Sequence, residues 1–299
     1  MLQGSHPTTP EGVLRRLEWR VLRRLDGRIQ GDYRTLLHGS GIDVAGTREY
    51  EPGDDVRHID WNLTARMDTP LVRTYHEDRE LTAWLLLDRS ASMTFGPIDR
   101  PKGFVLTELA TALARLLSRG GNLVGAILYN NSVELTIPPR TGRNHVLHLT
   151  RELLRPPEPT GTTTDLAGLV VAAGQTIKRR SLVIVLSDFI SVPGWERPLS
   201  ILSQRHEVVA IRLFDSREHD LPDAGWLVVE DAETGELLSV DTSDHEFRRR
   251  FSECAREREQ ATLDAARQAR VDLYPVSTED DLVTALVRIV ELRRGRRLG

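Results

Sequence analysis

The sequence predicts an α/β fold built on a doubly wound, mostly parallel sheet. Residues 81–87 and 182–186 are strongly apolar runs, typical of strands that are buried on both faces of a sheet. Between such runs lie stretches of ten or more residues whose apolar side chains recur at three- and four-residue steps, which is the helical period. Strands that alternate with helices of this length form parallel sheets with right-handed crossovers.

The elements can be placed in order along the chain. Residues 11–28 have the pattern of an amphipathic helix, and residues 71–75 alternate like a half-exposed strand. From residue 81 onward we predict strands at 81–87, 122–129, 132–137, 182–186, 207–214, 226–230, 237–240 and 271–276, and helices at 105–117, 143–154, 166–177, 195–204, 247–269 and 280–292. We therefore assign residues 1–80 to an N-terminal helical and extended segment and residues 81–295 to the α/β domain.

Composition excludes several classes of protein. The net charge is only -4 with 28% charged residues, which gives no whole-chain case for binding nucleic acid or an anionic membrane. The single cysteine, Cys254, excludes a disulfide framework and a cysteine-based zinc cluster, and we expect it to be partly buried in its helix. No apolar run approaches the roughly 18 residues of a membrane span, and no signal peptide is recognisable. We expect a soluble, cytoplasmic protein.

The first buried strand ends in a polar loop with the pattern Asp-x-Ser-x-Ser. Asp88 follows the apolar run directly, and Ser90 and Ser92 come at alternate positions after it. The carboxyl ends of parallel strands are where such sheets place their sites. One carboxylate and two hydroxyls are hard oxygen donors, which suit Mg²⁺ or Mn²⁺ better than Zn²⁺. The alternative is that each Asp or Ser only caps a helix after a strand.

This motif resembles the metal-ion-dependent adhesion site (MIDAS) of von Willebrand factor type A domains, which have a Rossmann-like fold. The resemblance implies two further ligands from later loops, a Thr and an Asp, and Thr164 and Asp188 stand at the matching places. The implied metal ligands are Asp88, Ser90, Ser92, Thr164 and Asp188. One departure from the pattern is Phe189, because many such domains have Gly after the last Asp. His145 and His148 could also share a metal, but a surface or packing role is the more ordinary interpretation.

A second motif indicates a more specific family that the sequence resembles. Residues 48–61 read Arg-Glu-Tyr-Glu-Pro-Gly-Asp-Asp-Val-Arg-His-Ile-Asp-Trp, and Thr-Ala-Arg follows at 64–66. Together with the Asp-x-Ser-x-Ser-Met run, this resembles the family called domain of unknown function 58 (DUF58), continuously from about Arg34 to Gly96. From the alternating charges of residues 55–66 we predict a structural latch that packs against the core, with an ion-pair network beside Trp61 as an aromatic anchor.

The resemblance implies a partnership, because members are commonly encoded beside MoxR-type AAA+ ATPases. It points to a non-enzymatic, metal-dependent adaptor that helps to assemble or activate other protein complexes, with an acidic residue of the partner completing the metal's coordination. Many relatives carry N-terminal membrane helices, a feature that this sequence does not show. Two alternatives stay open, a metal-free scaffold and a Mg²⁺-dependent hydrolase. The sequence disfavours the hydrolase, because it has no nucleophile elbow, no phosphate loop and no His in the three site loops.

Overall fold

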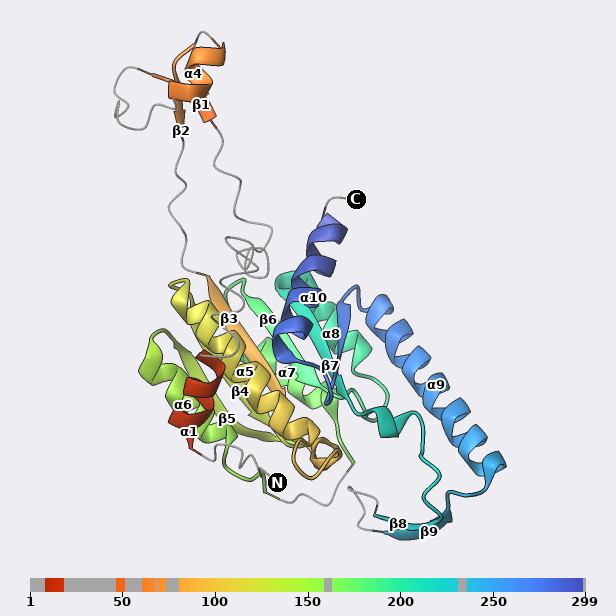
Figure 1. Ribbon diagram of the computed structural model, residues 1–299. Coiled ribbons are helices and arrows are strands. Elements are labelled where there is room, and N and C mark those ends of the chain that lie inside the picture. Colours follow the sequence, from red (N-terminus) through yellow and green to blue (C-terminus); the bar gives the residue numbers. More distant parts are fainter. Residues whose placement is uncertain are drawn as a thin grey trace. The chain divides into compact units, whose positions relative to one another are not determined.

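The computed structural model describes residues 9–18, 47–51, 61–67, 69–73, 81–158, 163–230 and 236–297 (Figure 1). The chain divides into two compact units, one of residues 38–80 and one that contains residues 1–37 together with residues 81–299. Each unit is considered by itself below.

The larger unit contains a six-stranded sheet in its described residues, with the strand order β10-β7-β6-β3-β4-β5. Neighbouring strands are parallel from β10 through β4, and only β5 at one edge is antiparallel, so the predicted edge hairpin is confirmed. The strands are β3 (Thr82–Asp88), β4 (Leu123–Tyr129), β5 (Val133–Arg140), β6 (Leu182–Ser187), β7 (Glu207–Phe214) and β10 (Asp272–Ser277). This is the doubly wound, mostly parallel arrangement that the sequence predicts.

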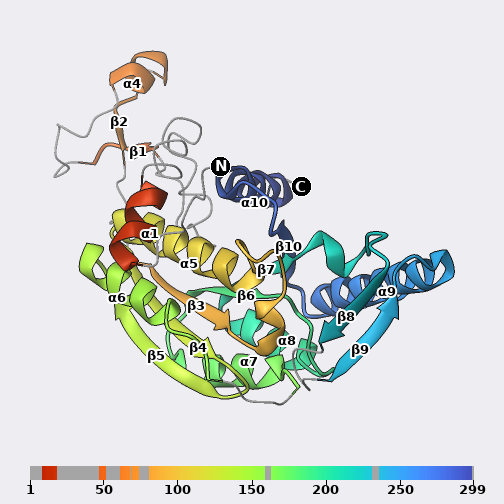
Figure 2. The same cartoon turned by 60° about the horizontal axis from the view of Figure 1, so that its bottom comes forward.

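Helices cover both faces of this sheet. They are α1 (Pro10–Leu17), α5 (Lys102–Arg119), α6 (Arg143–Leu153), α7 (Leu166–Thr176), α8 (Glu196–Arg205), α9 (His245–Gln268) and α10 (Leu282–Arg297). In Figure 2, α1, α5, α6 and α10 lie on one face, and α7, α8 and α9 lie on the other. The described residues of this unit also form two short 3-10 helices, η3 (Ala91–Thr94) and η4 (Ser216–Glu218), and a hairpin of β8 (Trp226–Glu230) and β9 (Leu237–Asp241).

Strand β3 shows how the sequence builds two cores. Its side chains alternate between the faces, with Leu85 and Leu87 in the core under α5 and with Trp84 and Leu86 in the core under α7. All four are less than a tenth exposed, so burial on both faces explains why the strand is continuously apolar. Asp88, the last residue of β3, is the first ionisable side chain after this apolar run and marks the carboxyl edge of the sheet.

The smaller unit pairs β1 (Thr47–Glu49) with β2 (Leu71–Arg73) as antiparallel strands and has one described helix, α4 (Trp61–Met67). Trp61, the predicted aromatic anchor, is 68% exposed. Asp55, Arg57 and Asp60, which the predicted ion-pair network requires, lie outside the described residues.

Two further expectations concern the exposure of Cys254 and the length of the N-terminal helix. Cys254 is exposed rather than partly buried, because α9 is amphipathic and only Ala255 and Ala266 along it are fully buried. The helix predicted at 11–28 is described from Pro10 to Leu17, and its later residues lie outside the described part. Within the described residues, no helix is long and apolar enough to cross a membrane.

Helix α7 approaches strand β4 closely at one glycine. A Cβ atom added to Gly168 would stand 2.1 Å from the hydroxyl oxygen of Tyr129. That hydroxyl donates a hydrogen bond to the carbonyl oxygen of Asn131 at 3.0 Å, so the Tyr129 ring is held in place. The absence of a side chain at residue 168 therefore sets how near α7 can lie to the end of β4.

We expect Gly168→Ala to lower the free energy of unfolding by about 1–3 kcal/mol, because the new methyl group must displace the Tyr129 ring. Gly174 provides a control in the same helix, since no atom lies within 4 Å of a Cβ added there. Gly174→Ala should raise the free energy of unfolding by up to about 1 kcal/mol through helix propensity. Urea denaturation measures both values, and equal stability of the two variants would contradict the packing argument.

Candidate functional site

The loop after β3 brings three of the predicted ligands together. Asp88 is the last residue of β3, and Ser90 and Ser92 follow at the start of η3. The backbone N–H of Ser90 donates to Oδ1 of Asp88 at 2.9 Å, and the hydroxyl oxygens of Ser90 and Ser92 are 3.1 Å apart. The tight turn therefore places one carboxylate and two hydroxyls side by side.

The adjacent strand β6 supplies a second carboxylate. Leu87 and Leu186 are register partners in the parallel pair, so the residues that follow them emerge next to each other. The hydroxyl of Ser187 donates to Oδ2 of Asp88 at 2.6 Å, and Asp188 comes next. Oδ1 of Asp188 accepts the backbone N–H of Ile190 at 2.9 Å, which fixes the carboxylate in its loop.

Thr164 lies in the loop before α7, next to the helix N-cap residue Asp165, and is almost completely buried. Its carbonyl oxygen accepts the backbone N–H of Val192 and the hydroxyl of Ser191, each at 3.0 Å. These two contacts hold the backbone of Thr164 beside the loop that carries Asp188. The five predicted ligands thus come from three loops at the carboxyl edge of one sheet.

The two carboxylates are buried and repel each other. Asp88 and Asp188 are 1% and 2% exposed. Burial and then the negative charge of Asp188 raise the pKa of Asp88 to about 6, although hydrogen bonds from Ser187 and Ser90 act in the opposite direction. A bound cation would offset the repulsion between two neighbouring carboxylates that have lost their hydration.

The donor set fits a small divalent cation. Adjacent ligands of an octahedral Mg²⁺ at 2.0–2.1 Å are about 3 Å apart, which matches the separation of the Ser90 and Ser92 hydroxyls. The described residues contain no cluster of three or more His, Cys, Asp or Glu side chains that could hold a metal ion. His145 packs against the carbonyl oxygen of Val124 at 2.6 Å and the side chain of His148 is half exposed, in agreement with a packing and surface role.

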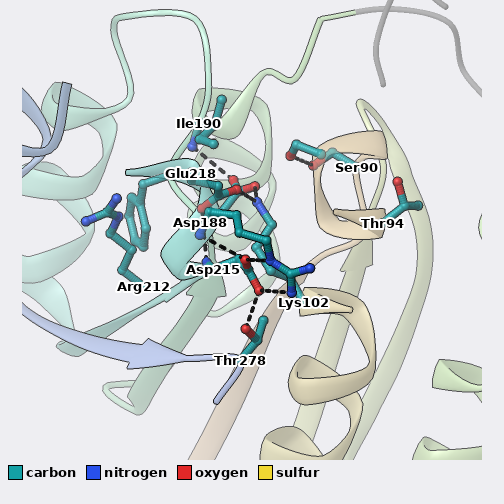
Figure 3. A network of polar contacts seen from close by, with 12 residues as sticks. Ser90, Thr94, Lys102, Asp188, Ile190, Arg212, Asp215, Glu218 and Thr278 are labelled. Carbon is teal, nitrogen blue, oxygen red and sulfur yellow. Dashed lines mark hydrogen bonds and ion pairs between the residues drawn. The ribbon is translucent and has the colours of Figure 1, made fainter. Parts of the chain in front are cut away.

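A buried lysine, which the sequence interpretation missed, lies at the same edge. Lys102 is completely buried, and its ammonium nitrogen is 2.6 Å from Oδ2 of Asp188. The same nitrogen forms an ion pair with Oε1 of Glu218 (Figure 3). Although burial favours the neutral amine, the attraction of Asp188 and Glu218 is greater and raises the pKa of Lys102 above its ordinary value. Lys102 is therefore a cation in contact with a predicted metal ligand.

The contacts of Glu218 continue away from the site. Its second oxygen accepts the backbone N–H of Asp215 at 3.2 Å as half of the capping box of η4. Asp215 in turn accepts hydrogen bonds from the hydroxyl of Thr278 and from Nε of Arg217, the latter at 2.8 Å. These contacts connect the ends of β7 and β10 and hold Glu218 in a fixed position.

Comparison with known sequences shows the family of the chain. Residues 46–261 match the family described as "Protein of unknown function DUF58". The chain belongs to the DUF58 family. An uncharacterized protein of Mycobacterium tuberculosis is 37% identical over 285 residues, which cover 94% of this chain and 89% of that protein.

Solved structures similar to this DUF58 chain are distant in sequence. BatB from Bacteroides thetaiotaomicron is 12% identical, with a TM-score of 0.46 and coverage of 72% of this chain and 99% of that one. The SpRpn10 VWA domain is 14% identical, with a TM-score of 0.37 and coverage of 70% and 95%.

Phe189 takes the backbone conformation that glycine would adopt. Its φ is +59°, in the left-handed region that L-residues rarely occupy. The side chain is 4% exposed, and its ring packs edge-on against Trp195 with the centroids 5.2 Å apart. Its N–H also donates to the Ser187 hydroxyl at 2.9 Å. Burial of the ring and this hydrogen bond together offset the backbone strain, so the DUF58 chain builds the turn without glycine.

Sequence composition contained a signal for Lys102 that local patterns did not. Only Lys102 and Lys178 among the 40 basic residues are lysines, and the other 38 are arginines. Lys102 is also the first residue of α5, where the positive end of the helix dipole disfavours a cation. A residue that contradicts both the local preference and the chain's own usage is a candidate for a tertiary role.

We expect Phe189→Gly to be more stable than Phe189→Ala by about 1–2 kcal/mol, because alanine retains the left-handed strain and glycine does not. Both variants lose the buried ring and should be less stable than the wild type, by roughly 3–5 kcal/mol for alanine. Chemical denaturation of the two variants gives the comparison. If alanine were the more stable replacement, as it is in ordinary helices and strands, the strain at Phe189 would be absent.

Proposed function

We propose that this protein is a non-enzymatic adaptor that binds a divalent cation, Mg²⁺ or Mn²⁺, and through it an acidic residue of a partner protein. The observation that supports this most is the buried group of Asp88, Ser90 and Ser92 beside Asp188, at the sheet edge where such folds bind ligands. Asp88, Ser90, Ser92, Thr164 and Asp188 would hold the cation. The cation would supply a positive centre that accepts a partner's carboxylate.

A cavity borders two members of this group, Asp88 and Ser90. It has a volume of about 320 Å³ and is lined by Asp88, Ser90 and Thr94 together with mainly apolar side chains of the α5 start and of residues 153–157. Because Asp88 and Ser90 are themselves buried, a partner side chain would reach them through such an opening. An apolar wall with a few polar groups at one end is typical of a binding site.

The chemistry of the site favours binding over hydrolysis. A metal-dependent hydrolase needs a base or a positioned nucleophile close to the metal. Residues 88–94, 163–165 and 188–192, which form the three site loops, contain no His or Cys, and the acidic residues among them that face the site belong to the ligand set. We therefore propose that the protein is not an enzyme.

One observation favours a second candidate, a metal-free scaffold. The ammonium of Lys102 already provides a positive charge at 2.6 Å from Asp188. If the Lys102 charge alone offset the repulsion between Asp88 and Asp188, this edge of the sheet would be stable without a metal. The partner would then be bound by other contacts. The addition of EDTA distinguishes the two candidates, because only the metal-dependent adaptor loses its partner.

We propose a MoxR-type AAA+ ATPase, or a client protein that it remodels, as the partner, acting with this chain in the cytoplasm to assemble or activate other complexes. The support is the resemblance of the 48–66 and 88–93 motifs to DUF58 proteins. The partner's acidic residue is expected because two anionic groups come together only when a cation lies between them.

Mg²⁺ or Mn²⁺ should stabilise the folded protein by about 2.7 kcal/mol at a hundredfold excess over the dissociation constant, because only the native state assembles the site. Asp88→Ala should remove this gain and leave the fold intact. Thermal denaturation of both proteins with and without the metal measures the effect. An equal rise in melting temperature for wild type and Asp88→Ala would exclude this site as the origin of the stabilisation.

Thr164→Ala should weaken binding to the ATPase by tenfold or more, on the order of the loss of one hydrogen-bonding ligand group at 1.4 kcal/mol or above. This variant removes a hydroxyl without a change of net charge, so it separates coordination from general electrostatics. Calorimetric titration of wild type and variant, each with Mg²⁺ and with EDTA, is the measurement. Wild-type binding that is unchanged by EDTA would rule out metal bridging for this pair.

A further inference from the structure

Lys102 combines several features that cost folding free energy and that point to a role at the site. Its side chain is completely buried, it occupies the first position of α5, and its ammonium contacts two carboxylates from different loops. Burial of a cation costs several kcal/mol before its partners are counted, and the helix N-terminus adds to this cost. The two partners, Asp188 and Glu218, come from the ends of β6 and β7, so the tertiary fold gathers all three groups.

The charges at this edge do not cancel. Asp88, Asp188 and Glu218 provide three carboxylates and Lys102 provides one ammonium, which leaves two negative charges in excess when all are ionised. Asp215 beside them has its own ion pair with Arg217 at 2.8 Å. One divalent cation would neutralise the excess. It would have to share Asp188 with the ammonium that already occupies one of its oxygens.

Glu218 provides an alternative position for the ammonium. The capping box of η4 and the contacts of Asp215 fix the Glu218 carboxylate, so it can hold Lys102 without help from Asp188. Lysine suits this double role better than arginine, because its ammonium is a compact charge with rotatable donors rather than a planar fork. The chain has lysine at this position although 38 of its 40 basic residues are arginines.

We propose that Lys102 is a tethered competitor of the divalent cation for Asp188, and that Glu218 holds the ammonium when the divalent cation binds. This inference rests on the proposed metal binding and adds what sets its strength. Lys102 weakens the site's affinity for the cation, whereas Glu218 restores part of it. Together, Lys102 and Glu218 therefore set the concentration of the cation at which the site becomes occupied.

The test is calorimetric titration of Mn²⁺ and of Mg²⁺ into the full chain and its variants, each first shown to be folded by circular dichroism. Lys102→Met should bind the cation about tenfold or more tightly than the wild type, within the usual range for coupling between neighbouring sites. Glu218→Gln should bind it more weakly, because the ammonium then has only Asp188 as an anionic partner. Opposite effects from the two members of one ion pair distinguish competition from loss of a structural contact.

The double variant Lys102→Met/Glu218→Gln separates competition from net charge. It leaves Asp88 and Asp188 without an ammonium, so the excess of two negative charges is the same as in the wild type. We expect it to bind the cation more tightly than the wild type, whereas a purely electrostatic effect would leave the affinity equal. Compared with Lys102→Met, the double variant removes one of the two carboxylates that lose the ammonium, Glu218, which makes it the safer protein if Lys102→Met does not fold.

Arg293→Met is the matched control. Arg293 is a buried cation of α10 that pairs with Glu207 at the start of β7, the opposite edge of the sheet from the site. Its replacement should leave the cation affinity unchanged. If Lys102→Met and the double variant bind with wild-type affinity, Lys102 is structural only and the inference is overturned while metal binding stands. If no folded protein in the series binds a divalent cation, both the inference and the proposed metal binding fail.

Discussion

Two buried carboxylates that repel each other, Asp88 and Asp188, are the constraint on which the rest of the carboxyl edge depends. Asp88 ends β3 and Asp188 follows β6, and these two strands are parallel neighbours. Their hydrogen-bonded register therefore fixes the two carboxylates close together. Each is held by several donors, from Ser90 and Ser187 for Asp88 and from Ile190 and Lys102 for Asp188. A pair of like charges is kept together by a rigid sheet, and the loops around it provide compensation.

The core supplies that rigidity. Because β3 and β6 are buried on both faces, their ends cannot shift without disturbing the packing of α5 on one side and of α7 on the other. Two of the site loops are tied to each other, as the contacts of Thr164 with Ser191 and Val192 show. Binding residues on a stiff scaffold lose little entropy when a ligand arrives, which suits the recognition role proposed for this site.

Two residues at this edge contradict local preference. Phe189 has the left-handed backbone of a glycine, and Lys102 places a positive charge at the positive end of a helix. Both are buried, and both are compensated by neighbours from other parts of the chain, Trp195 for Phe189 and Glu218 for Lys102. In proteins whose other segments agree with local rules, such exceptions gather where function competes with stability. Their position next to Asp188 agrees with that expectation.

The α/β class, the order of strands and helices from residue 81 onward and the DUF58 family could all be predicted from the amino-acid sequence, and the family resemblance supplied the five candidate ligands. Periodicity and motif spacing are local properties, and they fix which residues follow the buried strands at the carboxyl edge. The exposure of Trp61 and Cys254, the replacement of glycine by Phe189 and the contact of Lys102 with Asp188 could be seen only in the folded chain. Lys102 and Asp188 are 86 residues apart, and Lys102 and Glu218 are 116 apart. No pattern along the chain reports such contacts, because they exist only after strands β3, β6 and β7 have paired.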